Sequence, residues 1–161
     1  MKIAILSDIH GNLFALNSVL EDIKKNNVDE IFCLGDLAMA GPEPNKTIDF
    51  VKGQNWTIVQ GNTDKMIADY SEAVYNAVKE GAPIMANALE NDVKLVSVEN
   101  KEYLKQLPEK LAFEREGVKI LLVHGSPRQN NENIFPDLTK AQINEIVADV
   151  EENIIFCGHT H

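Results

Sequence analysis

Short apolar runs alternate with stretches of helical periodicity over the first sixty residues. Three runs rich in β-branched and apolar residues predict buried strands, at residues 2–7, 30–34 and 57–60. Helices are predicted over residues 13–23, with Asn12 placed as the N-cap, and over residues 45–52. Strands that alternate with helices in this way predict a parallel α/β arrangement with right-handed crossovers.

Residues 65–107 interrupt this alternation with a helical insertion. One helical period runs through Ile67, Tyr70, Val74 and Val78, and a second runs through Leu89, Val93 and Val96. Gly81-Ala82-Pro83 separates the two. We expect the insertion to cover the core, and its place directly after a polar motif makes it a candidate lid over a substrate or a surface for homo-oligomer formation.

The strand pattern resumes after the insertion. Residues 111–114 and 119–123 flank Glu116-Gly117 and predict a β-hairpin. Thr139 is placed to cap a helix, and residues 153–157 predict a last strand. A hairpin combined with parallel strands predicts a mixed sheet. No repeat or linker divides the chain, so residues 1–161 are expected to form a single domain.

Composition narrows the choice of partners. The 161 residues are 44% hydrophobic and 25% charged, as in one globular domain. The 25 acidic and 15 basic residues give a formal charge of −10, which disfavours long nucleic acid and anionic membrane surfaces. No apolar run reaches the roughly 18 residues of a membrane span, and the start lacks a signal-peptide pattern. With only Cys33 and Cys157, both in apolar runs typical of core residues, we expect a reduced, cytoplasmic protein.

Side chains able to bind metals follow five of the predicted strands. They include all four histidines of the chain, and the set is Asp8, His10, Asp36, Asn62, His124, His159 and His161. Because functional groups collect at the carboxyl ends of the strands in an open α/β sheet, we expect these seven side chains to share one edge. Glycines adjoin them at positions 11, 35, 61, 125 and 158, which allows the close backbone approach that a crowded ion site needs.

Seven nitrogen and oxygen donors exceed what one tetrahedral ion can take, but they suit two divalent ions that share a carboxylate. Imidazole and carboxylate donors without thiolate favour Mn²⁺, with Fe, Zn²⁺ and Ni²⁺ as alternatives, and disfavour a structural zinc site. Two ions about 3.5–4 Å apart suit in-line displacement at phosphorus. Cations covering Asp8 and Asp36 would also let a net-acidic chain accept a phosphate ester.

Five motifs together resemble those of the calcineurin-like metallophosphoesterase family: Asp8-x-His10, Gly35-Asp36, Gly61-Asn62-x-Asp64, His124 and Gly158-His159-Thr160-His161. They occur in family order from residue 8 to residue 161. The resemblance implies an α/β fold, a four-layer αββα sandwich with two mixed β-sheets. It implies a phosphoesterase in which a metal-bridging hydroxide attacks phosphorus. It also implies further strands after the last motif, so we expect this chain to be C-terminally incomplete.

The resemblance assigns each ligand a role. Asp8, His10 and His161 would bind the first metal, Asn62, His124 and His159 the second, and Asp36 would bridge them, with Asp36, Asn62 and His124 as catalytic residues. Many family phosphatases carry a histidine directly after the motif asparagine, where this chain has Thr63. A threonine hydroxyl cannot serve as a general acid near neutral pH. The chain therefore resembles the phosphodiesterase-like subgroup, which implies small phosphodiesters or activated phosphate esters and anhydrides as substrates, with nucleotides among the candidates.

Three further residues have two interpretations each. Asp64 either caps the next helix or supports the metal ligands. Asn12 either caps its helix or contacts a phosphate as well. Arg128, in the polar segment 126–133, is either a bidentate phosphate clamp or a solvated loop residue.

Two classes of function stay open at this point. The first is an enzyme: a phosphodiesterase, a dinucleoside polyphosphate hydrolase or a protein phosphatase. The second is a non-catalytic scaffold that retains the fold. Because a scaffold is free to lose metal ligands and all seven are present here, the sequence favours the enzyme.

Overall fold

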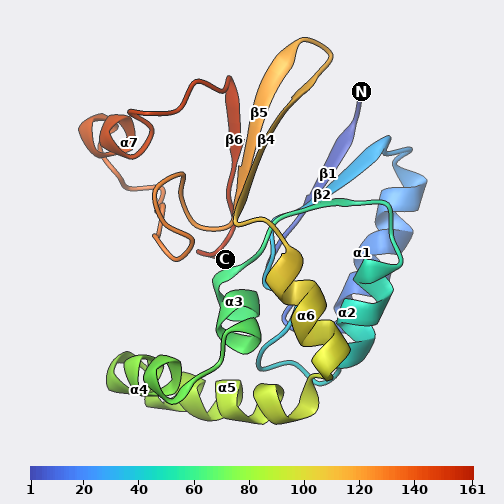
Figure 1. Ribbon diagram of the computed structural model, residues 1–161. Coiled ribbons are helices and arrows are strands. Elements are labelled where there is room, and N and C mark those ends of the chain that lie inside the picture. Colours follow the sequence, from blue (N-terminus) through green and yellow to red (C-terminus); the bar gives the residue numbers. More distant parts are fainter.

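Three parallel strands form the first sheet of the computed structural model, which describes residues 1–161 (Figure 1). The strands are β1 (Ile3–Leu6), β2 (Glu30–Cys33) and β3 (Thr57–Ile58), in that spatial order. The helices α1 (Leu13–Lys25) and α2 (Pro44–Lys52) connect them. Helix α1 begins where predicted, because the Asn12 side chain accepts a hydrogen bond from the Ala15 N–H at 3.0 Å. The predicted α/β start is confirmed.

Four helices follow β3 in the lower part of Figure 1. They are α3 (Asn62–Ala68), α4 (Glu72–Gly81), α5 (Pro83–Leu95) and α6 (Val98–Gln106). The single helix expected through Ile67 and Val78 is wrong, because α3 ends at Ala68 and the Ser71 hydroxyl starts α4 by accepting a hydrogen bond from the Val74 N–H. The apolar spacing continues across this break, so periodicity does not reveal it. The predicted break at Gly81-Ala82-Pro83 is confirmed.

The second sheet contains the predicted hairpin. Strands β4 (Lys110–Arg115) and β5 (Val118–Val123) pair antiparallel, and φ is positive at both turn residues, Glu116 (50°) and Gly117 (78°), as in a two-residue type I′ turn. After α7 (Lys140–Ile146), strand β6 (Ile154–Phe156) pairs parallel to β5. This sheet is mixed as predicted. The first sheet has only parallel pairs, so the expectation of two mixed sheets holds for one of them.

Two apolar cores account for the layers of the αββα sandwich. One core lies between the sheets. It contains Phe32, Leu34 and Val59 from the first sheet and the residues that directly follow its strands, together with Ile120 and Leu122 of the second sheet. A larger core joins the other face of the first sheet to α1, α2 and the insertion helices. Helix α7 lies beside the second sheet, and its buried Ile146 lines a pocket together with Leu121 of β5 (Figure 1).

The two cysteines differ in environment. Cys33 in β2 is fully buried as expected, whereas Cys157, directly after β6, is exposed, so its assignment to the core is wrong. The reason is that β6 has a neighbouring strand on one side only. No helix is both long enough and apolar enough to cross a bilayer.

Candidate metal centre

The ends of β1, β2, β5 and β6 meet at one edge of the sandwich. The loop after β1 is joined to the loop after β2, because the Asp8 N–H donates to the Gly35 carbonyl (3.0 Å) and the His10 N–H to the Asp36 carbonyl (2.9 Å). The two sheets are joined at the same place, since the His159 N–H donates to the Asp8 carboxylate (3.0 Å). Backbone hydrogen bonds therefore fix the loops that carry most of the predicted ligands.

Six of the seven predicted ligands form two groups. Asp8, His10 and His161 make one, Asp36, His124 and His159 the other, and within each group one ligand atom of every residue lies within 4.8 Å of the other two. In the first group, His161 Nε2 lies 3.4 Å from both His10 Nε2 and Asp8 Oδ1. Donors bound to one ion at about 2.0–2.2 Å lie roughly 3–3.5 Å apart, so the first group has the spacing of a coordination shell.

Asp36 lies between the two groups. Its Oδ2 atom is 3.7 Å from His10 Nε2 in the first group and 3.4 Å from His124 Nε2 in the second. The seventh ligand, Asn62, joins the second group, because its Oδ1 atom is 2.9 Å from His124 Nε2. The structure therefore brings all seven side chains together, in two groups with one carboxylate between them.

The backbone of the centre is strained. Outside glycine, φ is positive at nine residues, and five of these are predicted ligands: Asp8, His10, Asp36, His159 and His161. Two more, Met39 and Ala40, lie in the loop after Asp36. Such conformations cost energy and persist where the surroundings impose them, often at functional sites. Their concentration here is an independent indication that this edge is the functional site.

Backbone carbonyls orient two of the histidines. His124 is fully buried, with Nδ1 at 2.7 Å from the Leu34 carbonyl oxygen. In His10, Nδ1 lies 3.2 Å from the Met39 carbonyl oxygen. Because a carbonyl can only accept, each Nδ1 carries a hydrogen, and Nε2 is the ring nitrogen that faces the centre and would be the one to bind a metal.

Asp36 and His124 shift each other's pKa. Burial lowers the pKa of His124, but its contact with the Asp36 carboxylate outweighs burial, and the net pKa lies above the ordinary value. Burial raises the pKa of Asp36, and the contact with His124 again prevails, so the net pKa is lowered. Each charge therefore stabilises the other at the centre of the site.

Asp64 lies inside the first turn of α3, which begins at Asn62, and contacts the loop that carries Asp36. Its buried carboxylate accepts hydrogen bonds from three backbone N–H groups, those of Asp36 (2.8 Å), Leu37 (2.9 Å) and Gly61 (3.0 Å). The Gly61 contact caps α3, and the other two hold the loop that carries Asp36. Burial, with the nearby charge of Asp36, raises the pKa of Asp64 to about 7.

Gly35 and Gly61 allow the close approach that the sequence predicted. A Cβ atom on Gly61 would lie 2.0 Å from Asp36 Oδ1, and one on Gly35 would lie 2.2 Å from the Gly61 nitrogen. Gly35 also has a φ of 95°, which residues other than glycine rarely adopt. Any other residue at either position would push the ligand loops apart.

The residues fit divalent metal ions. Asp8 Oδ1 is buried and has no hydrogen-bond partner, although an unpaired buried carboxylate oxygen is costly. The donors are imidazole nitrogens, carboxylates and an amide oxygen, the set that suits borderline and hard divalent ions. A cation beside Asp8 Oδ1 would satisfy that oxygen.

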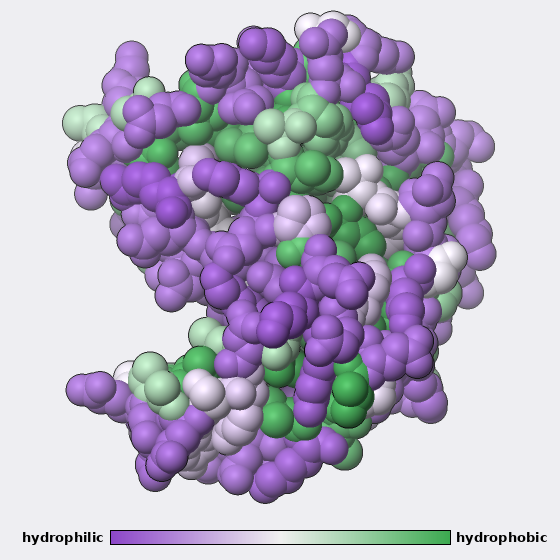
Figure 2. Space-filling model, viewed as in Figure 1, coloured by the Kyte–Doolittle hydropathy of each residue, from purple (hydrophilic) through white to green (hydrophobic).

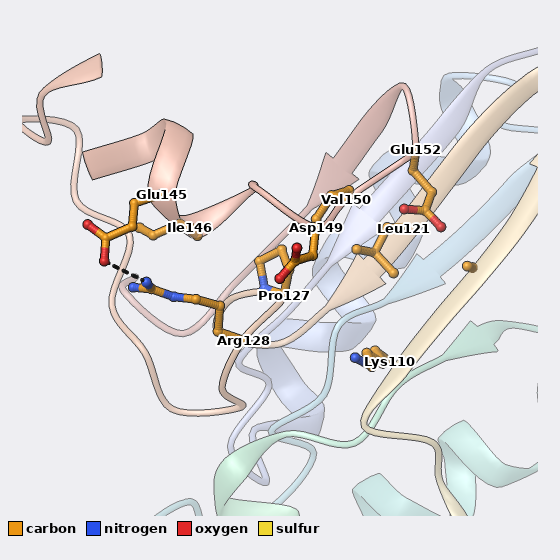
Figure 3. Close-up of a pocket in the computed structure, with 10 residues that line it drawn as sticks. Lys110, Leu121, Pro127, Arg128, Glu145, Ile146, Asp149, Val150 and Glu152 are labelled. Carbon is orange, nitrogen blue, oxygen red and sulfur yellow. Dashed lines mark hydrogen bonds and ion pairs between the residues drawn. The ribbon is translucent and has the colours of Figure 1, made fainter. Parts of the chain in front are cut away.

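Arg128 lines a pocket to which none of the seven predicted ligands contributes. Its guanidinium is paired with Glu132 (Nε–Oε2 3.1 Å) and Glu145 of α7 (NH1–Oε1 3.4 Å), beside a pocket on the outer face of the second sheet (Figure 3). The structure therefore gives Arg128 two carboxylate partners. Thr63 is engaged as well, since its hydroxyl donates to the Ala38 carbonyl (3.0 Å) and its N–H donates to the Asp36 carboxylate (2.9 Å).

Sequence reasoning missed Asp92. This residue of α5 is 3% exposed, and its carboxylate accepts a hydrogen bond from the Ala40 N–H at 2.7 Å. It therefore fastens the insertion to the strained loop whose Met39 carbonyl orients His10. The sequence contained one signal for this role. Asp92 lies three residues after Leu89, on the apolar face of its helix, and a buried acid there needs a hydrogen-bond partner.

The comparisons with known proteins agree with this geometry. Residues 1–161 match the calcineurin-like phosphoesterase superfamily domain. An uncharacterised protein of Methanocaldococcus jannaschii is 34% identical over 161 residues, which cover 99% of this chain and 62% of the relative. A metallophosphoesterase from Sphaerobacter thermophilus has a crystal structure with a TM-score of 0.76 and 29% identity, covering 100% of this chain and 61% of that one.

A symmetrical bis(5'-nucleosyl)-tetraphosphatase of Psychromonas ingrahamii matches a shorter part of the chain. It is 33% identical over 79 residues, 47% of this chain and 29% of the relative. The chain spans about three fifths of the length of the Methanocaldococcus and Sphaerobacter proteins.

Proposed function

Because the chain belongs to the calcineurin-like phosphoesterase superfamily, we propose that it is a hydrolase with a dinuclear metal centre, cleaving small phosphodiesters or activated phosphate esters and anhydrides. The observation that carries the proposal is the Asp36 carboxylate between two groups of ligands. In this proposal, Asp8, His10 and His161 hold one divalent ion, and Asn62, His124 and His159 hold the other. Mn²⁺ is the first candidate, followed by Fe, Zn²⁺ and Ni²⁺.

The protein residues act mainly by positioning. When bound, the two ions would lower the pKa of water to near neutrality and neutralise phosphoryl oxygens. Asp36 sets the separation of the two ligand groups, and the Leu34 and Met39 carbonyls keep His124 and His10 turned toward the centre. Asp64 holds the Asp36 loop in place.

The residue that follows Asn62 cannot act as a general acid and protonate the leaving group. The Thr63 hydroxyl is committed to the Ala38 carbonyl, so it is not available as a proton donor to the substrate. Loss of general acid catalysis typically costs about 10²–10⁴-fold in rate. Leaving groups that need no protonation, such as phenolates and phosphate chains, are therefore the favoured substrates.

The test is hydrolysis of bis-p-nitrophenyl phosphate with Mn²⁺, before and after treatment with a chelator. We expect turnover that the chelator abolishes and that Asp36→Asn reduces by at least about 10³-fold. Asp69→Asn is the matched control, because Asp69 is exposed at the end of α3 and outside the ligand groups. Turnover that survives chelation, or that Asp36→Asn leaves intact, would contradict the proposal. Metal binding without turnover on a substrate panel would favour the scaffold.

Dinucleoside polyphosphates are the second candidate substrate. The partial match to the tetraphosphatase of Psychromonas ingrahamii supports them, together with the lack of a need for leaving-group protonation. We expect diadenosine tetraphosphate to be cleaved with a kcat/KM above that of bis-p-nitrophenyl phosphate. The reverse order would favour simple phosphodiesters.

A further inference from the structure

A pocket of about 400 Å³ opens beside Asn62, between the insertion and the loop after β5. It is lined by Met39, Asn62, Thr63, Met66, Met85 and Asn131, together with Ala77, Val78 and Gly81 of α4 and Ala82 directly after it. In Figure 2, viewed as in Figure 1, the left side of the molecule is hollowed and hydrophobic surface lines the lower margin of the hollow. The volume is that of pockets which bind small organic ligands.

The chemistry of the lining is selective. Three of the four methionines of the chain line this one pocket, Met39, Met66 and Met85. Thioethers are polarisable and flexible, and they make favourable contacts with aromatic rings. The lining contains no charged side chain, although 25% of the chain is charged. An uncharged aromatic group therefore suits the pocket, whereas a phosphate or a charged peptide side chain does not.

The pocket is continuous with the metal centre. The Asn62 side chain lines the pocket, and its Oδ1 atom lies 2.9 Å from His124 Nε2 in the second ligand group. Met39 also belongs to both, because its carbonyl contacts His10 Nδ1. A group bound in the pocket would therefore lie next to the second ligand group.

We propose that this methionine pocket binds the uncharged aromatic or heteroaromatic group of the phosphate ester while the phosphorus lies at the metal centre. The proposal rests on the proposed phosphoesterase function and specifies its substrate class. The NH₂ group of Asn62 and the amide of Asn131 supply donors and an acceptor for a heteroaromatic edge. It gives the helical insertion a direct role, because helices α3, α4 and α5 supply most of the pocket wall.

Two phosphonates that differ only in their organic group test the pocket. Methylphosphonate and 1-naphthylmethylphosphonate are titrated into the Mn²⁺-loaded protein by calorimetry, so that the measurement does not depend on turnover. We expect the naphthyl compound to bind at least about tenfold more tightly, which corresponds to about 1.4 kcal/mol. Met85→Ser should narrow the ratio of the two affinities to about twofold.

Ile84→Ser is the control, because Ile84 neighbours Met85 in α5, is 83% exposed and does not line the pocket. It should keep the wild-type ratio. The pocket proposal would be overturned if the wild type bound the two phosphonates with equal affinity. It would also be overturned if Met85→Ser and Ile84→Ser lowered the ratio of the two affinities equally. If the protein hydrolyses phosphate esters but binds the two phosphonates with equal affinity, the pocket proposal is overturned while the phosphoesterase proposal stands. A ratio above ten without hydrolysis of any ester would support the pocket and overturn the phosphoesterase proposal.

Discussion

Asp64→Asn is the sharpest test of how the centre is assembled. The substitution keeps the size of the side chain and replaces one carboxylate oxygen by an NH₂ group. The wild-type carboxylate is fully buried and accepts hydrogen bonds from the N–H groups of Asp36, Leu37 and Gly61. An asparagine oxygen can replace the atom shared by Asp36 and Gly61. Its NH₂ group then faces the Leu37 N–H, and two donors oppose each other.

The cost follows from this geometry. A buried N–H left without an acceptor costs about 1–3 kcal/mol, and the Leu37 N–H lies in the buried interior. We therefore expect Asp64→Asn to lower the free energy of unfolding by about 1–3 kcal/mol. Because Leu37 directly follows Asp36, the Asp36 carboxylate should also move. Loss of a group that orients metal ligands typically weakens metal affinity about 10–100-fold, and we expect a loss in that range.

Urea unfolding of the metal-free protein measures the stability, and Mn²⁺ titration measures the affinity. Asp69→Asn is again the matched control, since it makes the same chemical change near the end of the same helix at an exposed side chain, 3.4 Å from the Lys105 ammonium. Its effect should stay within about 0.5 kcal/mol. Equal stability and equal Mn²⁺ affinity in the two variants would refute the positioning role of Asp64.

Four other expectations follow from the same structure. Asp92→Ala should lower stability by about 1–3 kcal/mol, measured by urea unfolding, because it leaves the Ala40 N–H unpaired. Asp92→Asn should recover most of that loss, because its amide oxygen can accept the same hydrogen bond. In native protein at pH 8, a thiol reagent should modify Cys157 alone, because burial raises the pKa of Cys33 to about 12. Gly61→Ala should abolish Mn²⁺ binding measured by calorimetry, since its methyl group would lie 2.0 Å from Asp36 Oδ1. Mn²⁺ at about 100 times its Kd should stabilise the fold by about 2.7 kcal/mol in unfolding experiments.

The sequence predicts which side chains lie together at this edge because a simple rule governs their placement. The carboxyl ends of strands that share an edge deliver their following residues to one place, and neither exact strand length nor helix packing affects that outcome. Strand β3 is only two residues long, against the four expected, yet Asn62 still reaches His124. Long apolar periods likewise predict that helices exist, but the break between Ala68 and Ser71 depends on a side-chain cap that the periodicity does not encode.

Features that depend on contacts between distant segments could not be predicted in this way. The partner of Asp92 is a backbone N–H 52 residues earlier in the chain. The partners of Arg128 include a glutamate on α7, which no local pattern identifies. The exposure of Cys157 depends on the position of β6 at the edge of its sheet, whereas its apolar sequence neighbours resemble those of a core residue.

The charge of the chain and the strain of the centre have a common explanation. The ionic partners of the Asp8 and Asp36 carboxylates are all histidine imidazoles, and no lysine or arginine reaches them. Buried Asp64 adds a third carboxyl group next to Asp36. Grouped acids with so little compensation are costly in a protein that already carries a formal charge of −10. Positive-φ backbone at five of the ligands adds to that cost. Divalent cations would offset both costs, because they would neutralise the carboxylates and stabilise the strained loops through coordination bonds. In the proposed function, the favourable energy of this arrangement would therefore come from the bound ions.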